Sequence, residues 1–123
     1  MSSITDSKGA GAYRVTDAIS EPFIVVSLEG RVLCWSPSAQ SSFGYSTDEA
    51  IGKDLDELIV VDELRAENSA ARAAAVTHGS VVFETVRRRK DGSRIRVKAC
   101  MRRADARDGP LFIACTEMDA TRS

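Results

Sequence analysis

The side chains with the widest chemical range in this chain are three cysteines and a single histidine. Cys34, Cys100 and Cys115 are odd in number and show no CxxC spacing, so we expect reduced thiols and a cytoplasmic protein. His78 precedes Gly79, at a position where a cation suits the C-terminus of a helix. One histidine cannot supply both a general base and a metal cluster, so we predict no metal site.

Paired carboxylates occur at residues 48–49, 56–57 and 62–63. Each pair falls in an early turn of a predicted helix, where acidic side chains interact favourably with the helix dipole. The sequence contains no nucleophile elbow, no Walker loop and no HExxH motif. We therefore predict a protein without enzymatic activity.

Charged side chains are unevenly distributed, although the formal net charge is only -1. Residues 87–103 hold nine of the 17 basic side chains and one acid, Asp91, whereas residues 48–67 hold eight acids against Lys53 and Arg65. The basic stretch lacks interleaved aromatic side chains. It therefore favours a solvated strand face that meets an acidic partner or second subunit, rather than a nucleic-acid site.

The composition suits one globular domain with its own core: 123 residues, of which 43% are hydrophobic and 28% charged. The longest apolar runs, residues 23–26 and 58–61, are too short to span a membrane. The polar start has no apolar segment of the kind found in signal peptides. These features again favour a cytoplasmic protein with no membrane association.

The hydrophobic pattern predicts strands at both ends of the chain and helices between them. Two strands should flank the turn dipeptide at residues 29–30, and a hairpin followed by a third strand should occupy residues 81–118. Strict alternation over residues 94–102 indicates a strand with one buried face. Capping residues and glycines predict short helices from 36 to 59, and an alanine-rich helix should run from 62 to 77. This order indicates an α+β fold.

We expect four segments along the chain. Residues 1–11 are small and polar and should form a disordered lead, and residues 12–20 should form an N-terminal helix. Residues 21–119 should form the core, and residues 120–123 should begin a linker to an output domain.

Several short motifs, in this order, resemble those of PAS domains. After Gly30 of the first hairpin, residues 35–39 (WSPSA) are similar to the family's W-N-x-A-A, and residues 43–52 (FGYSTDEAIG) to its F-G-Y-S-x-E-E-x-x-G. Residues 88–93 (RRKDGS) match the family's R-R-K-D-G-S hairpin. Residues 119–122 (DATR) resemble its D-I-T-x-R exit.

The resemblance spans residues 13–122, with Ser36 replacing the usual Asn and Ala120 replacing the usual Ile. It implies a five-stranded antiparallel sheet of order 2-1-5-4-3 with short helices on one face. Domains of this family sense small molecules, light or redox state, or dimerise, as modules of larger signalling proteins. The resemblance therefore implies a sensory and dimerisation module, with a histidine kinase as the expected parent protein.

The sequence identifies no cofactor. In LOV photoreceptors of this family the reactive cysteine lies in G-R-N-C-R-F-L-Q, and residues 52–59 (GKDLDELI) occupy that stretch here. Leu55 stands at the reactive position, which excludes a flavin–cysteine adduct. Heme-binding relatives carry a histidine inside the long helix, near Asn68 of this chain, so we do not expect heme on His78. Cys100 should be more exposed than Cys115, and we expect neither to be a redox sensor.

Ligands of the family lie between the sheet and the helices, and the hairpin loop decides which side chains of residues 81–89 face that space. A two-residue turn would direct Val82, Glu84 and Val86 inward. A three-residue loop over residues 90–92 would instead direct inward Phe83, Thr85 and Arg87. The resemblance favours the three-residue loop.

The predicted pocket is apolar with a few polar groups, which suits a small ligand of mixed polarity. The sheet should contribute Val25, Ser27, Phe83, Thr85, Arg87, Ile95, Val97, Ala99, Met101, Ile113, Cys115 and Glu117. The helical side should contribute Trp35, Phe43, Ile51, Leu55 and Leu58. The alternative is a structural interaction module whose core these side chains fill, with no ligand.

Two further sets of residues are predicted to act in signalling. Tyr13, Val15 and Ile19 have little to pack against if their helix stands alone, so we expect this helix to form a homodimer. Asp119, Thr121 and Arg122 match the family's exit motif, and we expect them to pass a signal to other domains of the same chain.

Overall fold

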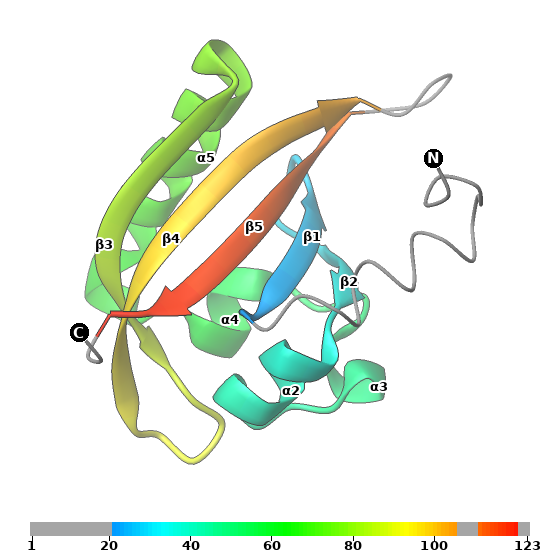
Figure 1. The fold of residues 1–123 in the computed structure, drawn as a ribbon, viewed down its shortest axis with the longest axis vertical. Coiled ribbons are helices and arrows are strands. Elements are labelled where there is room, and N and C mark those ends of the chain that lie inside the picture. The colour runs from blue at the N-terminus through cyan, green and yellow to red at the C-terminus, as the bar shows by residue number, and fades with distance from the viewer. Residues whose placement is uncertain (1–20, 106–110, 121–123) are drawn as a thin grey trace, which may run out of the picture.

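The computed structural model describes residues 21–105 and 111–120. They form one five-stranded antiparallel sheet whose strand order, β2-β1-β5-β4-β3, is the predicted one. The strands are β1 (Phe23–Ser27), β2 (Val32–Trp35), β3 (Ser80–Arg88), β4 (Arg94–Asp105) and β5 (Leu111–Asp119). The last strand of the chain therefore lies in the middle of the sheet, between the first strand and the fourth (Figure 1).

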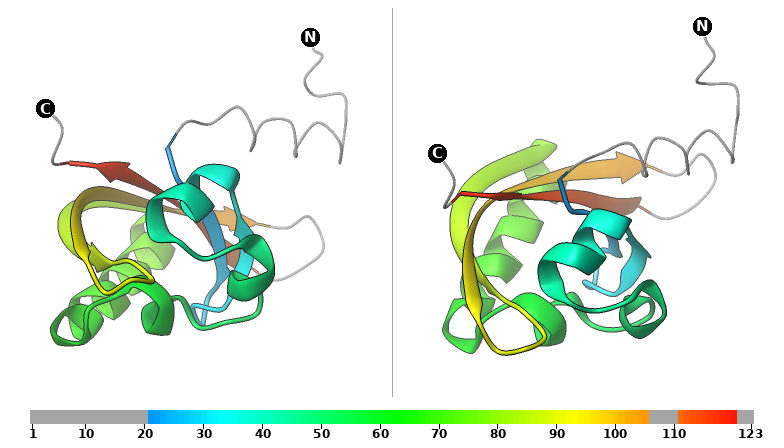
Figure 2. Two further views of the ribbon diagram at one scale, coloured as in Figure 1. Left: turned by 90° about the horizontal axis from the view of Figure 1, so that it is seen from below. Right: turned by 60° about the horizontal axis from the view of Figure 1, so that its bottom comes forward.

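The helices all lie on one face of this sheet (Figure 2). They are α2 (Pro37–Phe43), α3 (Thr47–Ala50), α4 (Leu55–Ile59), the 3-10 helix η1 (Asp62–Leu64) and α5 (Arg65–His78). In the views of Figure 2 the loop between β3 and β4 curves round to the helical side. The amide of Lys90 in that loop donates to the carbonyl oxygen of Phe43 at 2.8 Å, which ties the hairpin to the end of α2.

Local sequence signals determine where the short helices begin and end. The side chains of Ser36, Ser46 and Asp54 cap α2, α3 and α4, each accepting a hydrogen bond from a backbone amide in the first turn. Glu49 completes a capping box with Ser46. Gly44 ends α2 in the left-handed conformation, with φ of 89°, which glycine adopts without a steric penalty.

The hairpin between β3 and β4 confirms the three-residue loop. Arg88 is opposite Arg94 in the register, and the amide of Arg89 donates to the carbonyl oxygen of Ser93 at 2.8 Å. Gly92 has a φ of 91°, the left-handed conformation that this loop requires. The loop therefore directs every second side chain of β3, from Phe83 to Arg87, toward the helices.

Several predicted segments lie partly or wholly outside the described residues. These are the lead at 1–11, the helix at 12–20 and the final residues 121–123, so two of the three proposed output residues, Thr121 and Arg122, have no structural description here. Within the predicted core at 21–119, residues 106–110 also lie outside the described residues.

We predict that Ser36→Ala lowers the free energy of unfolding by about 1–3 kcal/mol. The buried Ser36 hydroxyl accepts hydrogen bonds from the amides of Phe23, at 2.9 Å, and Ala39, at 3.1 Å, and so joins β1 to α2. Ser41→Ala, at an exposed position of the same helix, is the matched control and should change stability by less than about 0.5 kcal/mol. Equal losses for the two variants in urea unfolding would contradict the prediction.

Candidate functional site

The strands contribute most of the predicted inward-facing residues. Every second residue of β4, from Ile95 to Met101, is buried, as the alternation predicted. On β5 the buried side chains are those of Ile113, Cys115 and Glu117. On β3 they are Thr85 and Arg87, and the half-buried Phe83 packs against the core beside them. Within the β4 set, Val97 and Ala99 have almost no exposed surface.

The inward orientation predicted for Val25 and Ser27 on β1 is wrong. Ile24 and Val26 are the buried residues of this strand, because Ile24 lies opposite the inward-facing Cys115 on β5. A shift of one residue in the register moves every side chain of a strand to the other face. Residues 23–26 are all apolar, so the sequence carries no alternation from which the correct face could be read.

On the helical side, four of the five predicted residues reach the interior. Trp35, Phe43, Leu55 and Leu58 are buried, and the Trp35 indole N–H donates to the carbonyl oxygen of Tyr45 at 2.9 Å. Ile51 does not belong to this set: its side chain is 41% exposed, because it follows the last residue of α3 on the surface. The prediction also missed Ile59, Val60, Ala71 and Ala75, which are buried core residues.

The most distinctive feature of the interior is a fully buried ion pair between β3 and β5. Arg87 and Glu117 have no exposed surface, and Arg87 is the largest fully buried side chain of the described residues. The Arg87 Nε–H donates to Glu117 Oε1 at 2.8 Å, and the Arg87 Nη2–H donates to Glu117 Oε2 at 3.3 Å. Two parallel bonds of this kind hold a guanidinium and a carboxylate in a defined relative orientation.

The same guanidinium also contacts the helices. Its Nη1–H donates to Asn68 Oδ1 on α5 at 3.0 Å, and Asn68 Nδ2–H donates to Asp56 Oδ1 on α4 at 3.1 Å. Arg72, on α5, lies 3.7 Å from the same Asp56 oxygen. A continuous polar network therefore runs from the sheet to both helices, with charges that alternate in sign.

The environment of the ion pair explains its protonation state. Burial alone would lower the pKa of the Arg87 guanidinium, because a buried site disfavours charge, but the Glu117 carboxylate raises this pKa above its ordinary value. The Glu117 carboxylate outweighs the effect of burial and keeps the Arg87 guanidinium charged. Burial raises the pKa of the neighbouring Cys115 thiol, and Glu117 raises it further, so this cysteine is an unreactive core residue.

The apolar side chains of the predicted pocket are enclosed among the described residues. Phe43, Leu55, Met101 and Ile113 belong to the hydrophobic core, each with 1% or less of its surface exposed. A hollow of about 510 Å³ lies elsewhere, open to solvent, between the end of α2 and the β3–β4 loop; residues 41–44 and 89–91 line it.

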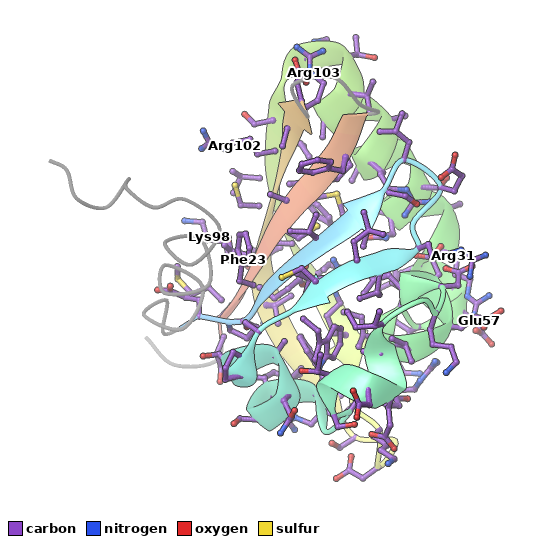
Figure 3. All side chains as sticks on the ribbon, turned by 90° about the vertical axis from the view of Figure 1, so that its right-hand side faces the viewer. Phe23, Arg31, Glu57, Lys98, Arg102 and Arg103 are labelled. Carbon is purple, nitrogen blue, oxygen red and sulfur yellow. The ribbon has the colours of Figure 1, made fainter. Side chains whose placement is uncertain are left out.

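Much of the basic stretch pairs with acids of the same chain. Lys90 contacts Glu49 at 2.6 Å, and Arg94 contacts Glu63 at 3.5 Å, so the hairpin meets the acidic helical segment. Figure 3 shows Lys98 and Arg102 on the side of the sheet away from the helices. The expected acidic partner surface is therefore supplied in part by this molecule itself.

The positions at which the family resemblance would place a cofactor carry side chains that are engaged within the domain. Leu55 is packed in the core, and Asn68 is occupied by its bonds to Arg87 and Asp56. Within residues 21–105 and 111–120, His, Cys, Asp and Glu side chains form no cluster of three that could hold a metal ion. None of the described helices is long and apolar enough to cross a membrane.

Comparison with known proteins agrees with the fold. The family model described as PAS fold matches residues 13–120, so the chain belongs to the PAS family. No curated protein sequence matches the chain.

Solved structures share the fold at low sequence identity. The PAS domain of a protein from Colwellia psychrerythraea is 19% identical with a TM-score of 0.81, over 93% of this chain and 98% of that one. A domain of a sensor histidine kinase/response regulator from Geobacter sulfurreducens is 21% identical with a TM-score of 0.71, over 89% and 93%. The LOV protein of Rhodobacter sphaeroides is 18% identical with a TM-score of 0.77, over 97% and 70%.

We predict that Arg87→Met and Glu117→Leu are each strongly destabilising, by about 3–5 kcal/mol, because each leaves a buried charge without its partner. The double variant should recover most of this loss, since replacing both charges removes the unpaired group. Urea unfolding of the four proteins gives the coupling energy directly.

Arg96→Met is the matched control for this cycle. Arg96 lies on the neighbouring strand β4 and contacts Glu84 at 3.3 Å, with both side chains more than 60% exposed. An exposed pair of this kind contributes about 1 kcal/mol or less. If Arg87→Met lowers the free energy of unfolding by no more than Arg96→Met does, the buried pair has no special role in stability.

Proposed function

We propose that this PAS domain is a signal-relaying and dimerisation module of a signal-transduction protein, with a histidine kinase as the parent, and that its interior holds no ligand. The observation that carries this proposal is the buried Arg87–Glu117 pair, which occupies the space between sheet and helices. The packing supports the filled core that the structural alternative predicted, whereas the signalling and dimerisation role follows from the family. Membership of the PAS family supports a role in signalling rather than catalysis.

The position of the pair supports a relay. Glu117 lies on the central strand β5, two residues before the strand ends at Asp119. Asp119, with Thr121 and Arg122 beyond it, is the proposed output segment. A change on the helical side that moved Arg87 would therefore reach the exit of the domain over a short distance.

The proposed partners follow from the surface and from the N-terminal segment. Residues 12–20 are proposed to form a homodimer contact, and other domains of the same chain are proposed to receive the signal.

We place the protein in the cytoplasm, on the basis of its free cysteines. Nucleic acid is not a proposed partner, because much of the basic stretch is paired within the molecule.

Native mass spectrometry tests the filled interior. We expect the purified chain to have the mass of the polypeptide alone, with no absorbance in the visible region, because its own side chains occupy the interior. The same sample, denatured, provides the reference mass. A small molecule retained at one copy per chain would overturn this part of the proposal and restore the predicted ligand pocket.

Removal of residues 1–20 tests the dimer. We expect the full chain to sediment as a dimer and the truncated chain as a monomer, because Tyr13, Val15 and Ile19 lose their apolar contact with the partner. Circular dichroism should show that the truncated chain remains folded. An unchanged sedimenting mass would rule out this segment as the dimer contact.

Asp119→Ala tests the output role in the signalling protein that carries the domain. We expect the response to its signal to disappear. Asp is a good N-cap for a helix that would follow β5, so the domain should lose only about 1 kcal/mol of stability, the usual contribution of a helix cap. Met118→Ala, at the exposed neighbouring position, is the control and should respond normally. A normal response from Asp119→Ala would limit this residue to a structural role.

A further inference from the structure

The last three residues of β5 are attached to the rest of the domain differently from the remainder of the strand. The paired register with β1 ends at Thr116, opposite Phe23, so beyond this point β5 has strand pairing only with β4. The amide of Glu117 still donates to the carbonyl oxygen of Pro22 at 3.0 Å. Glu117 is the only fully buried side chain of the three, since Met118 is 44% exposed and Asp119 half-buried.

Arg87, to which Glu117 is bound, is itself held firmly. Its backbone pairs with Ile95 of β4 on one side and forms an isolated bridge with Val60, just after α4, on the other. Its side chain reaches Asn68 of α5, which in turn reaches Asp56 of α4. The end of β5 is therefore connected to both helices through three successive side-chain contacts.

A polar connection of this kind transmits displacement differently from apolar packing. The hydrophobic attraction between apolar side chains is not directional, so it does not tie one particular atom to another. A buried guanidinium and carboxylate cannot separate without leaving unpaired charge in a medium of low dielectric constant. The partners must therefore move together.

We propose that the Glu117–Arg87–Asn68–Asp56 network is the coupling device that transmits a displacement of α4 or α5 to the end of β5. This inference rests on the proposed relay function, and it adds to that function the residues that carry the signal through the interior. The network connects the helical side of the domain to the segment immediately before Asp119.

Amide hydrogen exchange of the full 123-residue chain, measured by NMR, tests the proposal. Asn68→Leu keeps the side chain similar in size and breaks the connection between Arg87 and Asp56. We expect exchange of the Glu117 and Ala120 amides to rise about fivefold to tenfold relative to that of Val32, because the strand end opens locally. These amides donate to Pro22, Arg96 and Lys53 respectively.

Thr85→Val is the matched control. Thr85 lies on the same strand as Arg87, and its hydroxyl donates to Glu67 of α5 at 3.1 Å, outside the network. This variant should leave the relative exchange of Glu117 and Ala120 within about twofold of the wild-type value. An effect as large as that of Asn68→Leu would mean that the loss of any contact between β3 and α5 loosens the end of β5. That result would overturn the proposal.

A third comparison separates coupling from general stability. In the Arg87→Met/Glu117→Leu background the connection is already absent, so Asn68→Leu should no longer alter the relative exchange of the strand end. Equal acceleration of Val32, Glu117 and Ala120 in the Asn68→Leu single variant would assign the network to stability alone and overturn the proposal. Because exchange is measured without an output domain, its result is independent of the Asp119→Ala signalling test.

Discussion

The arrangement of this domain depends on one electrostatic requirement, that the guanidinium of Arg87 be neutralised where no water reaches it. The β3–β4 loop directs Arg87 inward, and Glu117 on the central strand β5 presents its carboxylate to the guanidinium. Asn68 satisfies the remaining face of the guanidinium and positions α5 against the sheet. The strand order, the hairpin register and the position of α5 together bring these side chains into contact. The contact is important because a buried charge without a partner is destabilising.

Electrostatic matching continues on the surface. The hairpin that follows Arg87 is basic and bends toward the acidic helical segment, where Lys90 meets Glu49 and Arg94 meets Glu63. Opposite charges that are far apart in sequence are brought together by the curvature of the sheet. Lys98 and Arg102 remain on the outer face, directed away from the helices (Figure 3). The small net charge reflects nearly equal numbers of basic and acidic side chains, 17 and 18, rather than a shortage of charged groups.

For a PAS domain, an interior occupied by its own ion pair changes the expected origin of the signal. In a ligand-binding module the bound molecule would contact the sheet and the helices together. Here Arg87 makes these contacts itself, through Glu117 on one side and Asn68 on the other. In the proposed relay, the signal would therefore enter through movement of the helices or of a dimer partner, and leave at the end of β5.

Local patterns in the sequence were sufficient to predict the helix caps at Ser36 and Ser46, because a cap depends on residues close together in the chain. The strand order and the choice of the three-residue loop, in which Gly92 has a positive φ and Arg87 faces inward, came from the family resemblance. The faces of β1 could not be predicted, because its uniformly apolar residues fit either register and pairing with β5 decides between them. The sequence identified Arg87 and Glu117 as polar residues of the interior, but only the tertiary structure joined them, since the two lie 30 residues apart and meet across β4. Long-range packing in the folded sheet determines such a contact, and local sequence preferences do not encode it.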